Sequence, residues 1–425
     1  MQTTSFWNDN FPRPTNLPVA DELPTQVDVA IVGGGYTGLS AARTLRKAGV
    51  SVAVLERNQI GWGASSRNGG ITGCGLKKGA QAIFKEYGEK YGHFFWQAGL
   101  DALDLVVELS EKDGIDCDLQ QNGDLCVAYK PSHFEGFKER IRWHKENLGH
   151  ELELVAPSEL QSEIGSPAYF GGVIDHHGTG IHPAKLVYNL AKFVAAQGAI
   201  LVENAGVSKI EKLDQGYALE TARGYLEAKE VIIATNGYTE KSLSPALKRK
   251  AFSVGSYSIV TEPLSDELRM SISPKGRMFW DSKWFLNYFR LTPDGRLLWG
   301  GRNNLSTTLD LANSAAILHS EMLRAFPQLA DVNVTHTWTG QLAIPFDLMP
   351  NIGRLDDGIH YALGYGGHGL HTALYLGQEI AQILTGEKTS SPFMEIPHQT
   401  YFFYRDKAWF LPFAAMYYRV RDALS

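Results

Sequence analysis

Three glycines near the N-terminus have the spacing of a phosphate-binding turn. Gly33, Gly35 and Gly38 form a GxGxxG pattern, which permits a tight turn, a close approach of the backbone to a pyrophosphate, and close packing of the following helix on the preceding strand. Glu56 ends the next strand-like run, where a carboxylate accepts hydrogen bonds from ribose hydroxyls and repels a 2′-phosphate. The pattern predicts a dinucleotide site that favours FAD or NAD over NADP.

A long loop of small residues, GWGASSRNGG at 61–70, indicates which of these two cofactors to expect. Its hydrogen-bond donors are Ser65, Ser66, Arg67 and Asn68. A simple NAD dehydrogenase does not require such a loop, whereas an extended dinucleotide lying along its backbone does. We therefore expect FAD, with Arg67 compensating phosphate or flavin charge; a plain solvent-exposed loop is the alternative.

Glycines recur near the C-terminus, in the run GYGGHG at 364–369. This run also matches GxGxxG and precedes a helical pattern at 370–384, but residues 387–392 read as a loop where a second strand ending in an acid would have to follow. We therefore expect no second dinucleotide site. Glycine-rich backbone at a helix N-terminus suits the electron-rich edge of a flavin, because the helix dipole favours negative charge there.

Local patterns predict the elements that position these motifs. A strand at 27–32, a helix at 39–48 that ends at Gly49, and a strand at 51–55 enclose the first glycine motif. Antiparallel hairpin strands are expected at 252–261, 284–291 and 296–300. The remaining expected elements are helices at 77–112, 132–147 and 183–197, and strands at 206–213, 217–221, 225–235 and 359–363.

Parallel α/β patterns at both ends of the chain, with antiparallel patterns between them, predict two interleaved domains. One is a Rossmann-like FAD-binding domain of the α/β class, and the other is an α+β substrate domain built on an antiparallel sheet. The FAD-binding domain is expected at 27–80, 150–245 and 335–388, the substrate domain at 81–149 and 246–334, an N-terminal arm at 1–26 and a C-terminal tail at 389–425.

Composition limits the partners and the location. The 425 residues include 40 Lys and Arg against 46 Asp and Glu, a net charge of −6, which argues against a nucleic-acid partner. Three cysteines without a CxxC pair fit a reducing compartment, so we expect a cytoplasmic protein, with no secretory signal and no transmembrane segment. The aromatic run at 408–418 is expected to pack on its own domain; peripheral contact with a membrane surface is the alternative.

With these motifs, the sequence resembles the D-amino-acid oxidase-like (DAO) family of FAD-dependent oxidoreductases, and most of all its γ-glutamylputrescine oxidases. The resemblance extends from residue 27 to residue 386. It implies FAD as the cofactor and oxidation of the C–N bond of a primary or secondary amine, with oxygen or a quinone as electron acceptor. The motifs that carry it are VAIVGGGYTGLSAARTL, IGWGASSRNGG, IHPAKLVYNL, VIIATNGYT, WTGQLAIPFDLMPNIGRL and GYGGHGLHTALYLGQEIAQILTG.

The resemblance implies cofactor contacts at the matching positions of this sequence. The phosphate turn and the ribose acid correspond to Gly33, Gly35, Tyr36, Thr37, Gly38, Glu56 and Arg57. The loop beneath the flavin corresponds to Gly63, Ala64, Ser65, Arg67, Asn68, Gly69 and Gly70. Val207 fits a position near the adenine, Thr235 and Asn236 the loop after the last parallel strand, and Gly366, Gly367, His368, Gly369 and Leu370 the flavin edge.

Two departures from the family pattern bear on flavin attachment and on the substrate. Sarcosine oxidases of the family attach their flavin through a cysteine before the proline that closes the WTG segment, but residues 338–350 contain no cysteine or histidine, which implies noncovalent FAD. Amino-acid oxidases of the family carry a GxRP-type sequence whose arginine binds the α-carboxylate. The corresponding residues here are Gly340-Gln341-Leu342-Ala343, so we expect an amine without a carboxylate on the reacting carbon, such as γ-glutamylputrescine.

Five side chains are candidates for positioning the substrate amine. They are Tyr257, Tyr288 and Arg290 on the antiparallel sheet, Trp338, and His368 within the second glycine run. For the tyrosines and the tryptophan, core packing is an equally supported role, and Arg290 is an alternative cation for a substrate carboxylate. No metal site is predicted, because the neighbouring histidines 176, 177 and 182 lack an HExxH pattern or a carboxylate at ligand spacing.

Two other functions stay open at the level of the sequence. One is a glycine, sarcosine or D-amino-acid oxidase or dehydrogenase of the same fold, which the missing arginine disfavours. The other is a flavin-containing protein that modifies or binds RNA, which the acidic balance and the absence of basic blocks disfavour.

Overall fold

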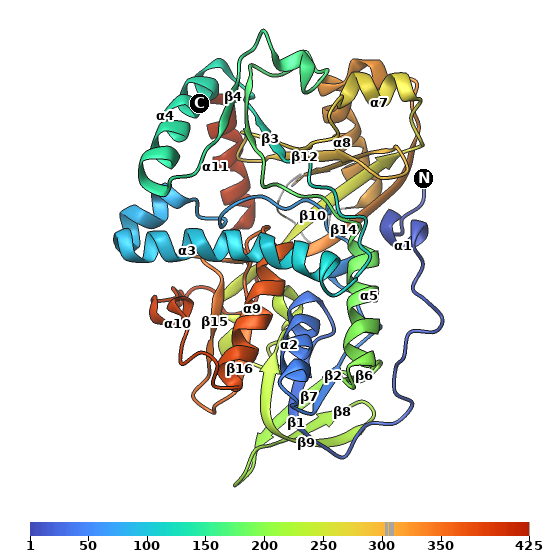
Figure 1. The fold of residues 1–425 in the computed structure, drawn as a ribbon, viewed down its shortest axis with the longest axis vertical. Coiled ribbons are helices and arrows are strands. Elements are labelled where there is room, and N and C mark those ends of the chain that lie inside the picture. The colour runs from blue at the N-terminus through green and yellow to red at the C-terminus, as the bar shows by residue number, and fades with distance from the viewer. Residues whose placement is uncertain (302–304, 306–309, 425) are drawn as a thin grey trace.

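The computed structural model describes residues 1–301, 305 and 310–424, and two eight-stranded sheets organise them (Figure 1). In the first sheet, neighbours from β16 to β6 are parallel, while β15 is an antiparallel edge strand and β8 and β7 extend β9 as an antiparallel meander. The main path runs through β15 (Asn351–Arg354), β16 (His360–Leu363), β9 (Gly224–Ile233), β1 (Gln26–Val32), β2 (Val52–Leu55) and β6 (Ile200–Val202), with β8 (Tyr217–Thr221) and β7 (Val207–Lys212) beside it.

Strand β1 is apolar on both faces because both faces are covered. Val29 and Ile31 point into the core formed with the helices, and Ala30 and Val32 point into a second core formed with the meander. A central parallel strand buried on both sides reads as a continuous apolar run rather than as an alternating one, which is why residues 27–32 predict this strand without showing a period of two.

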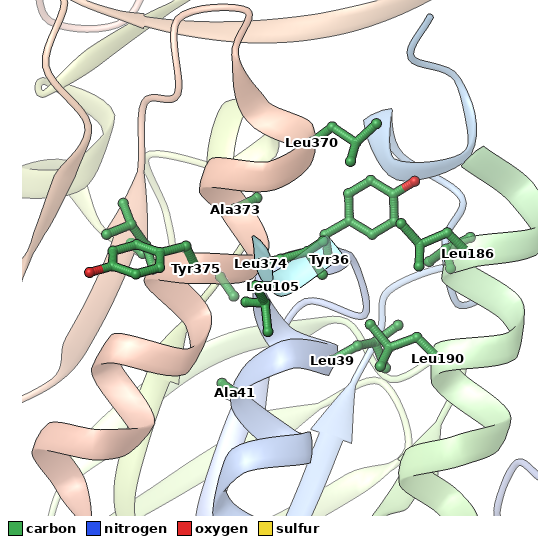
Figure 2. Packing of buried hydrophobic residues seen from close by; sticks show 14 of the residues in the cluster. Tyr36, Leu39, Ala41, Leu105, Leu186, Leu190, Leu370, Ala373, Leu374 and Tyr375 are labelled. Atoms are coloured by element: carbon green, nitrogen blue, oxygen red, sulfur yellow. The ribbon is translucent and has the colours of Figure 1, made fainter. Parts of the chain in front are cut away.

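The helices on one face of this sheet are α2 (Tyr36–Lys47), α5 (Pro183–Ala196), α9 (Gly369–Leu384) and α3 (Ala80–Glu111). Figure 2 shows Tyr36 and Leu39 of α2 facing Leu186 and Leu190 of α5, with Leu374 of α9 on the other side of α2. Helices α2 and α9 cross closely, because a Cβ at Gly377 would lie 2.2 Å from the carbonyl oxygen of Thr37. This crossing brings the two glycine runs of the sequence to one end of the sheet.

The second sheet is antiparallel except for the parallel pair β11–β3. Its order is β14 (Val334–Pro345), β10 (Ala251–Thr261), β13 (Leu297–Gly301), β12 (Asn287–Leu291), β11 (Met278–Asp281), β3 (Asp124–Val127), β5 (Gly172–Asp175) and β4 (Glu153–Val155). Helix α8 (Leu311–Ala325) buries Leu318 and Met322 against one face, and α4 (Pro131–Leu148) buries Phe137 beside β3 and β5. The last helices to be placed are α1 (Phe6–Asn10), α6 (Pro245–Lys248), α7 (Asp266–Ile272), α10 (Pro392–Glu395) and α11 (Leu411–Leu424).

The predicted fold class, an α/β Rossmann-like part interleaved with a part built on an antiparallel sheet, is confirmed. Two segments lie in a different sheet from the one we expected. Residues 150–175 and 335–345 contribute β4, β5 and β14 to the antiparallel sheet rather than to the FAD-binding part. Strands β4 and β5 are three and four residues long, too short to show a period, and β14 is placed by its pairing with β10.

No helix in the described ranges is both long enough and apolar enough to cross a membrane.

Two glycine substitutions should have opposite effects on stability, because only Gly377 lies in the close α2–α9 crossing. Gly377→Ala should lower the free energy of unfolding by about 1–3 kcal/mol, because the new methyl group forces two backbones apart. Gly136→Ala, in α4 with nothing within 4 Å of the new Cβ, should raise it by about 0.5–1 kcal/mol, since alanine is the better helix former. Urea denaturation measures both, and an unchanged midpoint for Gly377→Ala would contradict the tight crossing.

Candidate active site

A cavity of about 2000 Å³ lies between the two parts of the fold. This volume is about twice the upper end of the range usual for small-ligand pockets, so it has room for a dinucleotide and a second ligand. At one end it is lined by the first glycine run, Glu56 and Val207, and further along by the second glycine run and the face of the antiparallel sheet.

The first glycine turn leaves the N-terminus of α2 open to the cavity. Gly33 has a φ of 115°, and a Cβ there would lie 2.8 Å from the carbonyl oxygen of Ala234. A Cβ at Gly38 would lie 2.0 Å from the carbonyl oxygen of Gly33, so only glycine lets the helix start this close to the strand. The N-cap residue is Gly35, which has no side chain to cap the helix. Ser65 Oγ accepts a hydrogen bond from the Tyr36 N–H at 3.0 Å. Gly35 and Thr37 line the cavity beside it, so the positive end of the helix dipole is available to a pyrophosphate.

Glu56, just after β2, is held in a fixed orientation at the same end of the cavity. Its Oε2 accepts a hydrogen bond from the Gly34 N–H at 2.8 Å, and its Oε1 accepts one from Asn58 N–H at 3.0 Å. Burial raises the pKa of this carboxyl group above its ordinary value. Val207 and Arg57 line the cavity beside it, which gives the geometry of a ribose and adenine site.

The loop at 61–70 is anchored through four of its carbonyl groups. Each accepts a hydrogen bond from a side chain that is distant in sequence, and the four donors come from the N-terminal arm, from β14 and from β12. The pairs are Ser5 Oγ to Ser66 O at 3.0 Å, Trp7 Nε1 to Asn68 O at 2.8 Å, Trp338 Nε1 to Arg67 O at 2.8 Å, and Arg290 Nη1 to Gly70 O at 2.6 Å.

Three predicted catalytic residues do not line the cavity, and two of them anchor this loop. Trp338 and Arg290 are 1% and 0% exposed, do not line the cavity, and hold the loop instead. The Arg290 guanidinium also donates to the carbonyl oxygen of Ile181 at 3.0 Å and to the side-chain oxygen of Gln120, so its donors are engaged away from the cavity. Tyr257 is 0% exposed within the apolar core of the antiparallel sheet. The structure therefore places all three side chains outside the cavity.

The other two candidates, Tyr288 and His368, do line the cavity. The Tyr288 hydroxyl lies 3.2 Å from the hydroxyls of Ser256 and Ser258, and its ring covers Gly69, where a Cβ would approach it to 2.7 Å. His368 precedes α9 as its N-cap. His371, which sequence reasoning missed, lines the same region, and burial lowers the pKa of its imidazole to about 4, so it is neutral near pH 7.

Except for two glycines, every predicted cofactor residue lines the cavity. The exceptions are Gly38, which packs α2 on its strand, and Gly70, which has a φ of 68° and would place a Cβ 2.2 Å from the carbonyl oxygen of Ile181. In the second glycine run, at 364–369, Gly366 and Gly367 have φ values of 63° and 100°. An open helix N-terminus, a fixed ribose acid and a glycine-lined far wall together fit FAD.

The C-terminal tail forms part of the cavity wall. Trp409, Leu411, Ala415 and Arg419 line it. Helix α11 is docked by Asp422, whose carboxylate accepts hydrogen bonds from the N–H groups of residues 284 and 285 at 2.8 and 3.1 Å. The tail thus contacts its own protein through Leu411, Ala415 and Asp422, whereas Phe413 and Met416 are each 62% exposed. Contact of this exposed face with a membrane surface stays a prediction.

Beyond the flavin region the cavity has a polar end that the sequence did not reveal. Its lining residues there are Trp96 from α3, Asp124 from β3, Arg140 and His144 from α4, Asp175 from β5, and Trp280 from β11. Because these residues come from five elements, no spacing rule could have grouped them.

A histidine–aspartate cluster borders this end. His150 Nε2 lies 2.8 Å from Asp175 Oδ2 and His177 Nδ1 lies 3.1 Å from Oδ1, and the His150 contact holds the pKa of Asp175 below its ordinary range. With Cys74, these residues place one ligand atom each within 4.8 Å of one another. Such residue types also bind Zn²⁺, although the mutual hydrogen bonds already satisfy Asp175. The sequence analysis grouped His177 with His176 and His182. His176 is exposed beside Glu153, and His182 caps α5.

Comparison with known proteins agrees with this geometry. Residues 28–383 match the family described as FAD dependent oxidoreductase, DAO. The chain is 34% identical over 401 residues to the gamma-glutamylputrescine oxidoreductase of Escherichia coli strain K12, covering 93% of each protein. The crystal structure of glycine oxidase from Geobacillus kaustophilus superposes with a TM-score of 0.75 at 22% identity, over 88% of this chain and 100% of that one. L-Proline dehydrogenase from P. horikoshii gives 0.73 at 21% identity, over 87% and 96%.

The fixed carboxylate at Glu56 predicts a pH-dependent contribution to FAD binding. Glu56→Ala should weaken FAD retention by about 1–3 kcal/mol, because ribose donors lose a charged acceptor. In the parent protein, FAD affinity should fall as the pH decreases through the raised pKa of this group, since protonation removes the charge. Glu56→Gln should show weaker binding without that pH step. Equilibrium dialysis of FAD between pH 4.5 and 8 measures both, and an affinity of Glu56→Ala equal to that of the parent would mean that the acid is misassigned.

Proposed function

The chain belongs to the DAO family of FAD-dependent oxidoreductases, and from this premise we propose that it oxidises the C–N bond of a primary or secondary amine. The proposed substrate is γ-glutamylputrescine or a similar N-substituted amine, on the precedent of the relative that shares 34% of its sequence. The products would be an aldehyde and ammonia or an amine.

One observation favours oxidation of an amine over oxidation of an amino acid. The cavity wall at 340–343 presents the amide of Gln341 and the apolar side chains of Leu342 and Ala343. Arg290, the other candidate partner for a carboxylate, is held by backbone carbonyls outside the cavity. A carboxylate on the reacting carbon would therefore be desolvated there without the arginine that amino-acid oxidases of the family provide.

In the proposed mechanism the chain binds and orients, and the cofactor oxidises. Bound FAD supplies the two-electron chemistry by accepting a hydride equivalent from the carbon beside the amine. Glu56 and the α2 N-terminus hold the dinucleotide, and the anchored loop at 61–70 fixes one wall of the cavity. The Tyr288 ring, oriented by its hydrogen bonds to Ser256 and Ser258, positions the substrate's carbon chain. Water then hydrolyses the imine, and oxygen or a quinone accepts the electrons.

We also propose that FAD is held without a covalent bond. Residues 338–350 lack the attachment cysteine of the sarcosine oxidases. Cys74 lines the cavity, but burial and the nearby Asp175 raise the pKa of its thiol far above the ordinary value, so it stays protonated and is a poor nucleophile.

If FAD is bound noncovalently, denaturing the protein with acid should release the yellow flavin from it. Precipitation of the purified yellow protein with trichloroacetic acid should release the flavin into the supernatant, where absorbance and fluorescence measure it. Colour that remained in the washed pellet would contradict the proposal.

The cavity wall predicts a preference between matched amines. Putrescine and ethylamine should reduce the flavin anaerobically at least a hundredfold faster than ornithine and D-alanine, which differ only by a carboxylate on the reacting carbon. The wall at 340–343 lacks the arginine with which amino-acid oxidases of the family pair that carboxylate, and burying it without this partner costs several kcal/mol. Stopped-flow absorbance measures the rates. Faster reduction by the amino acid of either pair would refute the choice. Arg290→Ala should lower FAD retention and leave the rate ratio within each pair unchanged.

A further inference from the structure

The polar end of the cavity has the chemistry of a binding site for an α-amino-acid group. We infer that Asp124 and Arg140 bind the end of the substrate that is remote from the oxidised carbon, Asp124 taking an ammonium group and Arg140 a carboxylate. The inference rests on the proposed amine oxidation and adds a substrate class to it: amines whose far end carries a free amino-acid group, as a γ-glutamyl amide does.

Position on the sheet gives the separation between the two ends. Tyr288 pairs with Trp280 across β12 and β11, and β3, which carries Asp124, is the next strand. Asp124 is opposite Met278, two residues along from Trp280, so two strand spacings of about 10 Å combine with an offset of about 7 Å to give about 12 Å between the backbones, a distance that the side chains shorten. In γ-glutamylputrescine the oxidised carbon and the glutamyl α-carbon are joined by a chain that spans roughly 9–10 Å when extended. A substrate lying along this face of the sheet therefore reaches both ends.

Asp124 is a buried acid with unused hydrogen-bonding capacity. It is 4% exposed and lines the cavity. Its Oδ1 accepts a hydrogen bond from Trp280 Nε1 at 3.0 Å, and no group in the described part of the chain donates to Oδ2. Its strand partner Asp175 is already compensated by His150, whereas burial and the charge of Asp175 raise the pKa of Asp124 to about 7. A cationic ligand would stabilise the ionised form of this acid.

Arg140 is the complementary cation. It extends from α4 over the ring of Trp280, with 5.5 Å between the guanidinium carbon and the ring centroid, and it lines the cavity. No carboxylate among the described residues forms an ion pair with it. The charge of Arg140 acts on Asp124 and opposes the rise in the pKa of that acid, so the two side chains border the same space. A guanidinium group binds a carboxylate through two parallel hydrogen bonds.

Only a group with both charges satisfies both residues. A simple diamine would pair with Asp124 and leave Arg140 without an anion, and a dicarboxylate would do the reverse. An α-amino-acid group carries the ammonium and the carboxylate on one carbon. A ligand that lacks either charge would leave Asp124 or Arg140 desolvated without a counter-charge.

The test measures binding separately from oxidation. The ligand is γ-glutamylbutylamide, which lacks the terminal amine, and its analogues are glutaryl butylamide without the ammonium and 4-aminobutanoyl butylamide without the carboxylate. Calorimetry is done anaerobically on the holoenzyme with its FAD reduced beforehand, so that no ligand is oxidised. The parent should bind the γ-glutamyl compound at least tenfold more tightly than either analogue.

The variants assign each charge to its residue. D124N should lose the preference over the glutaryl analogue and keep the preference over the aminobutanoyl one, and R140Q should show the opposite pattern. R142Q, at an exposed position of the same helix, is the matched control and should behave as the parent. Retention of FAD and the visible spectrum of the bound flavin, which do not depend on the polar end of the cavity, report that each variant is still folded.

Two results would overturn the inference. One is a parent protein that binds the three ligands equally, and the other is a set of preferences that neither D124N nor R140Q alters although both variants keep their FAD. Failure of the proposed function has a different signature. In that case no amine reduces the flavin, although the calorimetric preferences and their loss in the variants persist.

Discussion

Four backbone carbonyls in one short loop connect the wall of the cavity to distant parts of the fold. Ser5, Trp7, Arg290 and Trp338 each donate a hydrogen bond to a different carbonyl of residues 66–70. Because these donors come from the N-terminal arm and from two strands of the antiparallel sheet, the loop reaches its final form only when both sheets and the arm have docked. Buried carbonyls that lose such donors cost about 1–3 kcal/mol each, so the cofactor site is coupled to the tertiary fold.

Glycine at close backbone contacts supplies the second constraint. A side chain at Gly38 would meet the carbonyl of Gly33, and one at Gly377 would meet that of Thr37. The first contact places the N-terminus of α2 over the end of β1, and the second holds α9 against α2, as in the packing around Tyr36 and Leu374 in Figure 2. The two glycine runs, more than three hundred residues apart in sequence, therefore face one cavity.

Charge is distributed unevenly along that cavity. The end near Glu56 suits a ribose, the middle is lined by Gln341, Leu342 and Tyr288, and the far end carries Asp124 and Arg140. Buried charges are costly unless they are paired, so a substrate that supplies both missing partners gains binding energy at a point remote from the reacting carbon. Such remote binding energy can orient the amine without placing a charge beside it.

The sequence by itself determined the family, FAD as its cofactor and the two-part fold, because the motifs that indicate them consist of residues that are neighbours in the chain and depend on short-range backbone geometry. The roles of Glu56 and of the loop at 61–70 stay predictions, although both line the cavity. The sequence did not determine which side chains face the cavity. Arg290 and Trp338 have the chemistry of substrate residues, yet long-range hydrogen bonds to loop carbonyls place both outside it. Asp124 and Arg140 gave no sequence signal, because only the pairing of short strands and the docking of α4 bring them to one face. Local spacing specifies backbone turns, whereas the direction of a side chain depends on the strand register and on packing partners far away in the chain.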